Sequence, residues 1–314
     1  MSAPLPPVPD LDHIRTAGKR GVARALAAVE TQRGTPALAA LLDTAARSAK
    51  AHVLGLTGPP GVGKSTLTNA LVHRARAAGL SVAVLAVDPS SRRTRGALLG
   101  DRARIQTDPE DRLVFVRSMA ARDRLGGLSD DAVAAVVLLR AVYDLVIVET
   151  VGVGQSEADI SLVADTVVLC IQPGSGDSLQ FMKAGVMELP DIIVVTKADM
   201  AEVARRAAAE VTGALSLSGA GGTDWAVPVL RLSASTGEGL AAFDDAIARH
   251  RAHLCEGGRR EALRAAQEEK WVEEAIKVRF GTHGLARARR IGAVGSGPFT
   301  REAAIAARLT SGTD

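Results

Sequence analysis

Aromatic residues are scarce in this sequence. They make up only 3% of its 314 residues, so a folded core must rest mainly on alanine, valine, leucine and isoleucine. Hydrophobic residues nevertheless reach 47%, which is ample for a buried core and excludes an intrinsically disordered chain. A chain of this length fits one large domain with appended segments.

Cysteine is almost absent. The two cysteines, Cys170 and Cys255, are far apart in the sequence and form no CxxC motif. This excludes a disulfide scaffold and a structural zinc site of the usual spacing. Cys170 lies inside the apolar run 167–171, so we interpret it as a small core residue.

Long apolar runs and a marked excess of one charge are also lacking. No uninterrupted apolar run is long enough to cross a bilayer, and residues 1–13 contain no apolar signal core. Asp10 and Asp12 argue against a transit peptide. The formal charge is +3 and the basic residues are scattered, whereas nucleic-acid binding usually needs a concentrated basic stripe. We therefore expect a cytoplasmic protein that binds neither nucleic acid nor membrane.

Short apolar segments alternate with helical patterns through the middle of the chain. Helical stretches lie at 65–78, 129–142 and 201–214. Continuously apolar strands separated by helices are typical of a mostly parallel sheet that is covered on both faces. The pattern therefore predicts a three-layer α/β fold, with strands at 52–57, 81–87, 113–118, 144–150, 165–171, 191–196 and 228–233.

Helical patterns also flank this central part. Two helices are expected between Leu11 and Ala51, with Gly34-Thr35-Pro36 as the break. After about Arg249 the strand signals stop, and charged, helical residues 258–280 lead into the Gly-rich stretch 281–300 and a short Ala-rich end. The helical ends would form arms on the α/β domain.

The segment 58-GPPGVGKS-65 follows the first strand and opens a helix, as the phosphate-binding P-loop motif requires. Glycines let backbone N–H groups turn toward phosphate oxygens, and the helix N-terminus adds positive potential. Lys64 would reach the β- and γ-phosphates, and the hydroxyl of Ser65 would ligate Mg²⁺. We expect the cradle itself to comprise Gly58, Pro60, Gly61, Val62, Gly63, Lys64, Ser65 and Thr66.

Three carboxylates follow or lie near the same edge of the expected sheet. Asp88 and Glu149 end strands, and Asp101 follows Gly100. Mg²⁺ prefers oxygen ligands, so these carboxylates suit a metal beside the phosphates, although strand-end and helix-cap carboxylates are also common. Glu149 begins an E-x-x-G arrangement in which the N–H of Gly152 could sense the γ-phosphate.

The segment 196-TKAD-199 ends another apolar strand and is close to the guanine-recognition motif N-K-x-D. Asp199 would accept bonds from N1–H and the amine of guanine, which adenine lacks, so it would select GTP or GDP over adenine nucleotides. The stem of Lys197 would cover the base, and a backbone N–H near Ala234 would meet O6. Thr196 replaces the usual Asn and can supply only part of its hydrogen bonding. The next strand end completes the expected base site with Ser233, Ala234 and Ser235.

Hydrolysis would depend on positioning and charge neutralisation by Lys64, the metal and Glu149. The group that orients water is less evident, because Val153 follows Gly152 where Ras-like proteins have a Gln. Gln155 is the candidate in this segment. Such an arrangement predicts slow intrinsic hydrolysis that a partner accelerates by ordering loops.

Together these motifs resemble the MeaB family of SIMIBI-class P-loop GTPases, which includes ArgK-like proteins and the human methylmalonic-aciduria type A protein. The resemblance runs from about His13 to Lys270 and is most specific in 149-ETVGVGQSE-157. Further segments that carry it are GPPGVGKST, AVDPSS, LLGD and PGSGDSLQ, which occur in the family's order.

The resemblance implies a chaperone that binds an adenosylcobalamin-dependent acyl-CoA mutase, typically methylmalonyl-CoA mutase, and uses GTP to gate cofactor loading and to protect the mutase. An adenosyltransferase is a further partner to consider. The family pattern places the Mg²⁺ ligands on Ser65, Asp88, Asp101 and Glu149. The partner-coupling loop 174–183 would include Asp177, Gln180 and Lys183.

Family members are usually homodimers that associate through helical arms. We therefore expect an N-terminal helical arm at 1–50, a P-loop GTPase domain at 51–250 and a C-terminal dimerisation arm at 251–314. Three alternatives remain: a nickel-insertion GTPase, which would need Cys or His clusters; an ATP-dependent kinase linked to amino-acid transport, which Asp199 opposes; and a scaffold that binds nucleotide without hydrolysing it.

Overall fold

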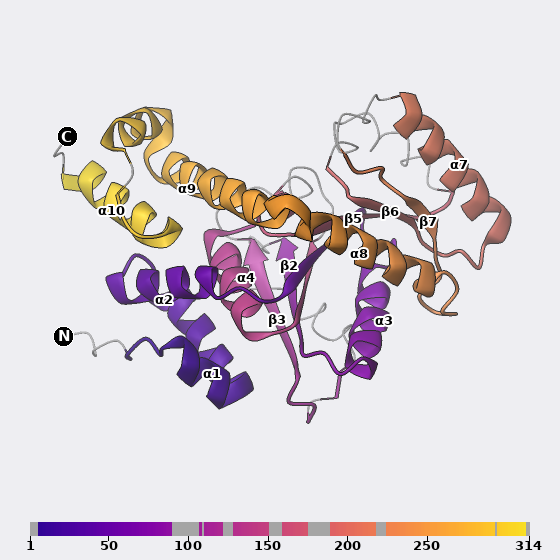
Figure 1. Ribbon diagram of the computed structural model, residues 1–314, viewed down its shortest axis with the longest axis horizontal. Helices are drawn as coiled ribbons and strands as arrows, with labels where there is room; N and C mark the ends of the chain where they lie inside the picture. Colours follow the sequence, from indigo (N-terminus) through magenta and orange to yellow (C-terminus); the bar gives the residue numbers. More distant parts are fainter. Residues whose placement is uncertain are drawn as a thin grey trace.

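The centre of the molecule is a sheet of seven parallel strands in the order β3-β2-β4-β1-β5-β6-β7 (Figure 1). The computed structural model describes residues 6–89, 107–108, 110–121, 128–150, 159–174, 189–217, 224–292 and 294–311. The strands are β1 (His52–Thr57), β2 (Val82–Pro89), β3 (Val114–Ala121), β4 (Leu145–Thr150), β5 (Thr166–Ile171), β6 (Ile192–Val195) and β7 (Val229–Arg231). The predicted parallel α/β fold is confirmed.

Helices cover both faces of the sheet, which explains why its strands are mostly apolar. Every residue of β1 and β5 is buried. Leu54 and Leu56 share a core with α3 (Lys64–Ala77) and α8 (Leu240–Cys255) on one face. On the other face Val53 packs in the core that contains α4 (Asp130–Val142), and Leu169 packs with α7 (Ala201–Leu217). These are the three layers that the alternation predicts.

The terminal helices pack together although they come from opposite ends of the chain. The pair α1 (Leu11–Thr31) and α2 (Pro36–Arg47) shares one core with α4, α9 (Arg259–Ile291) and α10 (Pro298–Ser311). Asp43 of α2 is 1% exposed, and its carboxylate accepts the N–H groups of Phe299 and Thr300 at 2.9 and 3.1 Å. An acidic side chain of α2 therefore caps the first turn of α10, where the helix dipole favours negative charge.

Gly281 bends α9, and the chain is helical on both sides of this bend. The residue has φ +71° and ψ −175°, a backbone conformation that side chains with a Cβ avoid. The chain then turns back on itself. As a result, the guanidinium of Arg289 lies 2.9 Å from the carboxylate of Glu273 on the earlier part of the same helix. In Figure 1 this end of α9 curls back above α10. Helix thus continues to Ile291 inside the segment 281–300.

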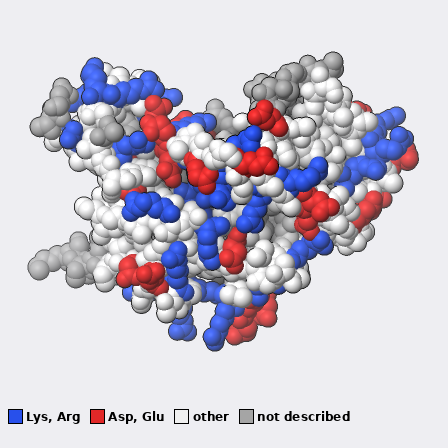
Figure 2. Space-filling model, viewed as in Figure 1, with Lys and Arg blue, Asp and Glu red and all other residues white. Residues whose placement is uncertain are grey.

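On the face shown in Figure 2, Lys and Arg side chains are interspersed with Asp and Glu. Exposed ion pairs of the molecule include Arg205 with Glu202 at 2.8 Å and Lys50 with Asp144 at 2.9 Å. Among the described residues, none of the helices combines the length and the apolar character that a membrane span requires.

Candidate nucleotide-binding site

The carboxyl ends of the strands, which we call the nucleotide edge, bring the expected motifs together. The P-loop follows β1, and β1 lies between β4 and β5. In register, Leu56 of β1 and Ala86 of β2 both pair with Glu149 of β4. The segment beginning at Thr196 leaves β6 on the other side of β5. Ligands bind at this edge in parallel α/β sheets, because the loops after neighbouring strands converge there.

The P-loop has the backbone that its glycines make possible. Gly58, Gly61 and Gly63 have φ values of +133°, +76° and +101°. A Cβ on Gly58 would lie 2.1 Å from the carbonyl oxygen of Cys170, so the close approach of the loop to β5 excludes any larger residue. The Cys170 thiol is buried, and burial raises its pKa to about 12, which agrees with the core position expected for it.

Lys64 and the start of α3 line this loop. Gly63 precedes the helix and has no side chain that could occupy the N–H groups of its first turn, which are the groups that bind phosphate in P-loops. Lys64 is 6% exposed, and its ammonium donates to the carbonyl oxygens of Gly58 and Pro59 at 2.7 and 2.9 Å. Val62 is buried, whereas Pro60 and Thr66 are exposed.

A second group of oxygen atoms lies where α3 meets β4. The hydroxyl of Ser65 donates to Oε1 of Glu149 at 2.6 Å, and the hydroxyl of Thr68 donates to Oε2 at 3.0 Å. Two of the expected metal ligands, Ser65 and Glu149, are therefore in direct contact. Hydroxyl and carboxylate oxygens are the donor types that suit Mg²⁺ beside a nucleotide.

The other expected residues are only partly covered. The backbone of Asp88 belongs to β2, one residue beyond the pair formed by Val87 and Thr150, so Asp88 lies at the same edge. Outside the described residues are Asp101, Gly152, Gln155, Asp177, Gln180 and Lys183.

Thr196 joins the expected base-recognition segment to the P-loop. Its side chain is 4% exposed, and its hydroxyl lies 2.7 Å from the carbonyl oxygen of Val62 and 3.0 Å from that of Ile171. A hydroxyl has a single hydrogen to donate, so these two carbonyls share it. Thr196, at the place of the motif's Asn, therefore links the strand end after β6 directly to the phosphate loop.

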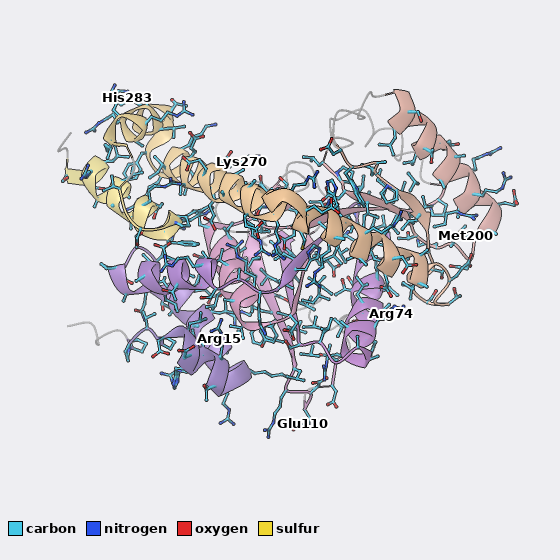
Figure 3. All side chains as sticks on the ribbon, in the orientation of Figure 1. Arg15, Arg74, Glu110, Met200, Lys270 and His283 are labelled. Atoms are coloured by element: carbon cyan, nitrogen blue, oxygen red, sulfur yellow. The ribbon has the colours of Figure 1, made fainter. Side chains whose placement is uncertain are left out.

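Residues 197–199 form a turn in which Asp199 is exposed. Lys197 has φ +55°, a conformation that is uncommon for a residue with a side chain and often marks a functional turn. Its ammonium donates to Oε1 of Gln172 at 2.8 Å, while Ala198 is held by its N–H to the carbonyl of Leu232. Met200, labelled in Figure 3, directly follows Asp199 and marks this position at the start of α7.

The strand end after β7 completes this part of the edge. Ser233 is buried and its hydroxyl lies 3.0 Å from that of Ser235, while Ala234 is half-buried between them. Because the N–H of Ser233 donates to the carbonyl of Glu238, the segment folds back on itself.

Two contributors were missed by sequence reasoning. Thr68 lies one helical turn after Ser65, so its spacing already places it on the same face of α3, but a threonine inside a helix gives no motif signal. Gln172 follows β5 and becomes relevant only through its contact with Lys197, which the sequence does not reveal.

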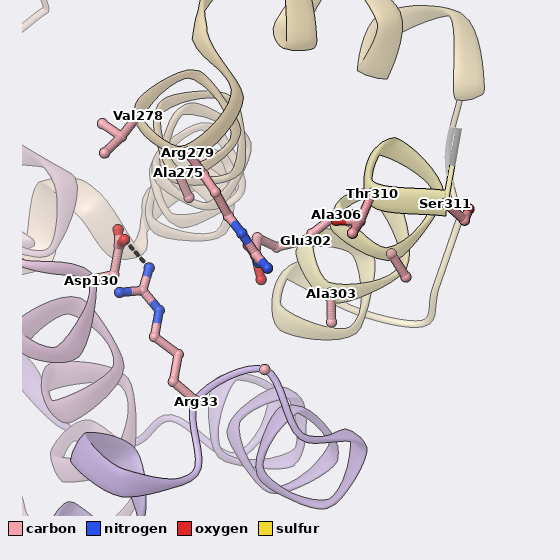
Figure 4. Close-up of a pocket in the computed structure, with 12 residues that line it drawn as sticks. Arg33, Asp130, Ala275, Val278, Arg279, Glu302, Ala303, Ala306, Thr310 and Ser311 are labelled. Carbon is pink, nitrogen blue, oxygen red and sulfur yellow. Dashed lines mark hydrogen bonds and ion pairs between the residues drawn. The ribbon is translucent and has the colours of Figure 1, made fainter. Parts of the chain in front are cut away.

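A hollow of about 830 Å³ lies elsewhere, among the turn after α1, the start of α4, and helices α9 and α10 (Figure 4). Its charged side chains form ion pairs with each other: Arg33 with Asp130, and Arg279 with Glu302 at 3.8 Å. Burial raises the pKa of the Glu302 carboxyl. Carboxylates on its walls make this hollow unsuited to a triphosphate. The nucleotide edge, where the motifs converge, is therefore the better candidate for the nucleotide site, although the hollow is large.

A parallel three-layer fold with a P-loop at a central strand defines a P-loop NTPase. The chain belongs to the MeaB family, described as "Methylmalonyl Co-A mutase-associated GTPase MeaB", whose model matches residues 22–287. It is thus a guanine-nucleotide-binding GTPase. A Pyrococcus horikoshii protein described as a GTPase is 42% identical over 276 residues, covering 87% of this chain and 86% of that protein.

Three further comparisons show similarity in sequence or fold. The mouse methylmalonic aciduria type A homolog, a mitochondrial protein, is 36% identical and covers 73% of this chain and 57% of its own length. A crystal structure described as LAO/AO transport system kinase superimposes with a TM-score of 0.69 at 29% identity, covering 90% of this chain and 88% of the other. HypB from Helicobacter pylori, solved in complex with nickel, has a TM-score of 0.51 at 20% identity over 68% of this chain and 94% of its own, which shows a shared fold.

Proposed function

We propose that this GTPase is a chaperone of an adenosylcobalamin-dependent acyl-CoA mutase, most simply methylmalonyl-CoA mutase, and that its nucleotide state gates cofactor loading and protection of that enzyme. The observation that carries the proposal is that the P-loop, Glu149 and the segment Thr196–Asp199 meet at one sheet edge in a chain of the mutase-associated family. The similarity to the mouse methylmalonic aciduria type A homolog supports the same reading.

In this proposal each described side chain has a defined task. Lys64 and the N–H groups of the loop neutralise the phosphates, and Asp199 selects guanine. Ser65 and Glu149 hold Mg²⁺ together with Asp88 and Asp101, and the metal supplies charge neutralisation at the transferring phosphoryl group. The direct contact between the Ser65 hydroxyl and the Glu149 carboxylate supports this assignment for the two residues.

Several finer parts of the proposal concern the partner. Gly152 would sense the γ-phosphate and Gln155 would orient water, while Asp177, Gln180 and Lys183 would couple the nucleotide to the mutase. Residues 251–314 would form the dimerisation arm beside a GTPase domain at 51–250, with 1–50 as the N-terminal arm. An adenosyltransferase would be a second partner in cofactor delivery.

Base selection can be tested by equilibrium titration of nucleotide-free protein with GDP and with ADP in Mg²⁺. We expect tight binding of GDP and weak binding of ADP. Asp199→Asn should remove the preference, because an amide cannot accept both guanine N–H groups as the carboxylate does. Glu202→Gln is the matched control: it neutralises a carboxylate that is three residues away, 83% exposed and paired with Arg205.

Equal binding of GDP and ADP by the wild-type protein would contradict the assignment of Asp199. A loss of preference in Glu202→Gln as large as in Asp199→Asn would show that the effect is general electrostatics and would contradict it as well.

The chaperone role can be tested by single-turnover GTP hydrolysis with and without a purified adenosylcobalamin-dependent acyl-CoA mutase. We expect faster hydrolysis with the mutase, because a partner that orders the loops positions water for attack. A rate that stays unchanged at saturating mutase would contradict the proposal, whereas the nucleotide assignment would stand on the titrations.

One observation favours a second function, an ATP-dependent kinase linked to amino-acid transport. The solved structure with a TM-score of 0.69 is described as a transport system kinase. That reading needs ATP, so the titration with ADP decides between the two functions.

A further inference from the structure

Thr68 is unusual among the helical threonines of this protein. The hydroxyls of Thr16, Thr31, Thr44 and Thr212 each donate to the carbonyl oxygen four residues earlier in their own helix, at 2.9, 2.7, 2.8 and 2.8 Å. This local bond is the usual choice for threonine in a helix. Thr68 instead donates out of α3 to Oε2 of Glu149 at 3.0 Å, and its side chain is 0% exposed.

The consequence of this bond is that both oxygens of one carboxylate are held from the same helix face. Ser65 and Thr68 are one turn apart on α3, and they bind Oε1 and Oε2 of Glu149 respectively. The last torsion of a Glu side chain is broad, so a second donor, on Oε2, restricts its rotation more than the Ser65 bond to Oε1 alone. The Thr68 hydroxyl therefore selects the orientation in which Oε1 faces Ser65 and the phosphate loop.

The backbone around Glu149 cannot supply this orientation by itself. Glu149 pairs with Leu56 on one side and Ala86 on the other, so its place in the sheet is determined by strand register. Register determines where the Cα lies and which face the side chain leaves from, but not the angle of the carboxylate plane. The hydroxyl donors of α3 contribute to that angle.

We propose that Thr68 is a positioning residue that holds Glu149 for metal binding at the nucleotide. The inference rests on the proposed function, in which Ser65 and Glu149 hold Mg²⁺. It predicts a separation of two properties: loss of the Thr68 hydroxyl weakens the response to Mg²⁺ while the affinity for GDP without metal is preserved.

The test measures the release rate of a fluorescent N-methylanthraniloyl derivative of GDP over a series of Mg²⁺ concentrations and in EDTA. In Thr68→Val, which keeps the shape and burial, we expect half-maximal slowing of release to need about tenfold more Mg²⁺, the effect of losing one bond to a charged group. Release in EDTA should match the wild-type protein. Thr68→Ser should restore the Mg²⁺ dependence because it keeps the donor.

A neighbouring buried hydroxyl provides the specificity control. Thr150 follows Glu149, is 2% exposed, and its hydroxyl lies 3.3 Å from that of Thr57. Thr150→Val should leave the Mg²⁺ dependence unchanged, and a shift as large as that of Thr68→Val would overturn the proposal. If Thr68→Val does not fold, Thr68→Ser can be compared with Thr68→Cys. Both variants lack the methyl group of threonine, and they differ only in carrying a hydroxyl or a thiol. Because a thiol is a weak donor, Thr68→Cys should need more Mg²⁺ than Thr68→Ser.

The outcomes also separate the inference from the function on which it rests. If release of the GDP derivative from the wild-type protein does not respond to Mg²⁺, the assignment of Ser65 and Glu149 to the metal fails. If the wild-type protein responds and the Thr68→Val response is identical, the positioning role of Thr68 alone is overturned. In a Glu149→Gln background Thr68→Val should add little, because the two residues act through one contact.

Discussion

Polar side chains are buried at both ends of the parallel strands, but the groups that they contact differ between the two ends. At the nucleotide edge, the partners of Lys64 and Thr196 include carbonyl oxygens of the P-loop and of the strand end beside it. At the opposite edge, which we call the amino edge because the strands begin there, Asp165 is 1% exposed in its side chain. Its carboxylate accepts from Arg264 of α9 at 2.7 and 2.8 Å and from the N–H of Val53 at 2.7 Å.

A chain of buried and half-buried polar groups runs along the amino edge beside this ion pair. His52 contacts the hydroxyl of Thr166 at 2.8 Å, and that hydroxyl contacts His250 at 2.7 Å. His250 in turn lies 3.3 Å from the carboxylate of Asp191. These groups belong to strand starts and to α8, so their positions are set by secondary structure.

The comparison teaches that buried charge does not by itself identify a functional site. Charges at the amino edge are compensated by side chains fixed on packed helices, which makes them structural. At the nucleotide edge, Lys64 and Thr196 donate to backbone carbonyl oxygens, and a phosphate can offer its own oxygens to such donors. The identity of the partner, rather than the degree of burial, separates a binding site from a structural network.

The largest expected effect comes from breaking the ion pair at the amino edge. Arg264→Met should lower the free energy of unfolding by about 3–5 kcal/mol, because it leaves the Asp165 carboxylate buried without its charged partner. Urea unfolding followed by circular dichroism measures this. Arg205→Met is the matched control on α7, since Arg205 is 67% exposed and should change stability by less than about 1 kcal/mol. A loss for Arg264→Met no larger than for the control would erase the contrast between the edges.

An intermediate effect is expected from pH. Burial lowers the pKa of His52 and of His250 to about 4 and raises that of Asp191 to about 6. Between pH 6.5 and 4 the unfolded chain therefore binds more protons at two histidines, while the folded protein binds more at one aspartate. The net difference of about one proton should reduce stability by roughly 1 kcal/mol per pH unit as the pH falls through this range.

Urea unfolding at a series of pH values checks the sign of this dependence. His250→Gln removes one of the two histidines, so the remaining histidine and Asp191 should nearly offset each other and flatten the curve. His73→Gln, at an exposed position on α3, should retain the wild-type slope. Stability that rises on acidification of the wild-type protein would refute the interpretation.

The smallest expected effect sharpens the comparison at the nucleotide edge. Thr196→Val removes the hydroxyl shared by the carbonyls of Val62 and Ile171 and should weaken GDP binding about fivefold, the effect of one neutral hydrogen bond of about 1 kcal/mol. Thr196→Ser should retain wild-type affinity. Calorimetric titration with GDP measures both variants, and wild-type affinity in Thr196→Val would show that this link does not support the loop.

Much of the fold was accessible from the sequence because its signals are local. The seven apolar segments and the glycines at 58, 61 and 63 predict strands and a phosphate loop from patterns within a few residues. Long-range pairs give no such signal. Asp43 caps a helix 256 residues away, and Arg264 meets Asp165 across 99 residues, so neither partner could be inferred from spacing.

The residues of the candidate site also fall into two groups, those that the sequence predicts and those that only the structure reveals. Lys64, Ser65, Glu149 and Asp199 follow from motifs. The structure places Lys64 against loop carbonyl oxygens and Ser65 against the carboxylate of Glu149. Thr68 and Gln172 acquire their contacts only when α3 packs on β4 and β5 lies beside β6. Motif residues are recognised by type and spacing, whereas supporting residues are recognised by what they touch.

By itself the sequence determined the class of this protein: alternating apolar strands and helices, a P-loop after the first strand and an Asp at the guanine position specify a parallel α/β GTPase. Tertiary structure decided which buried polar groups meet at the nucleotide edge and which hold the sheet to α8 and α9. The physical reason is that strand and loop preferences act between near neighbours, while the partner of a buried charge is chosen only when distant helices pack against the sheet.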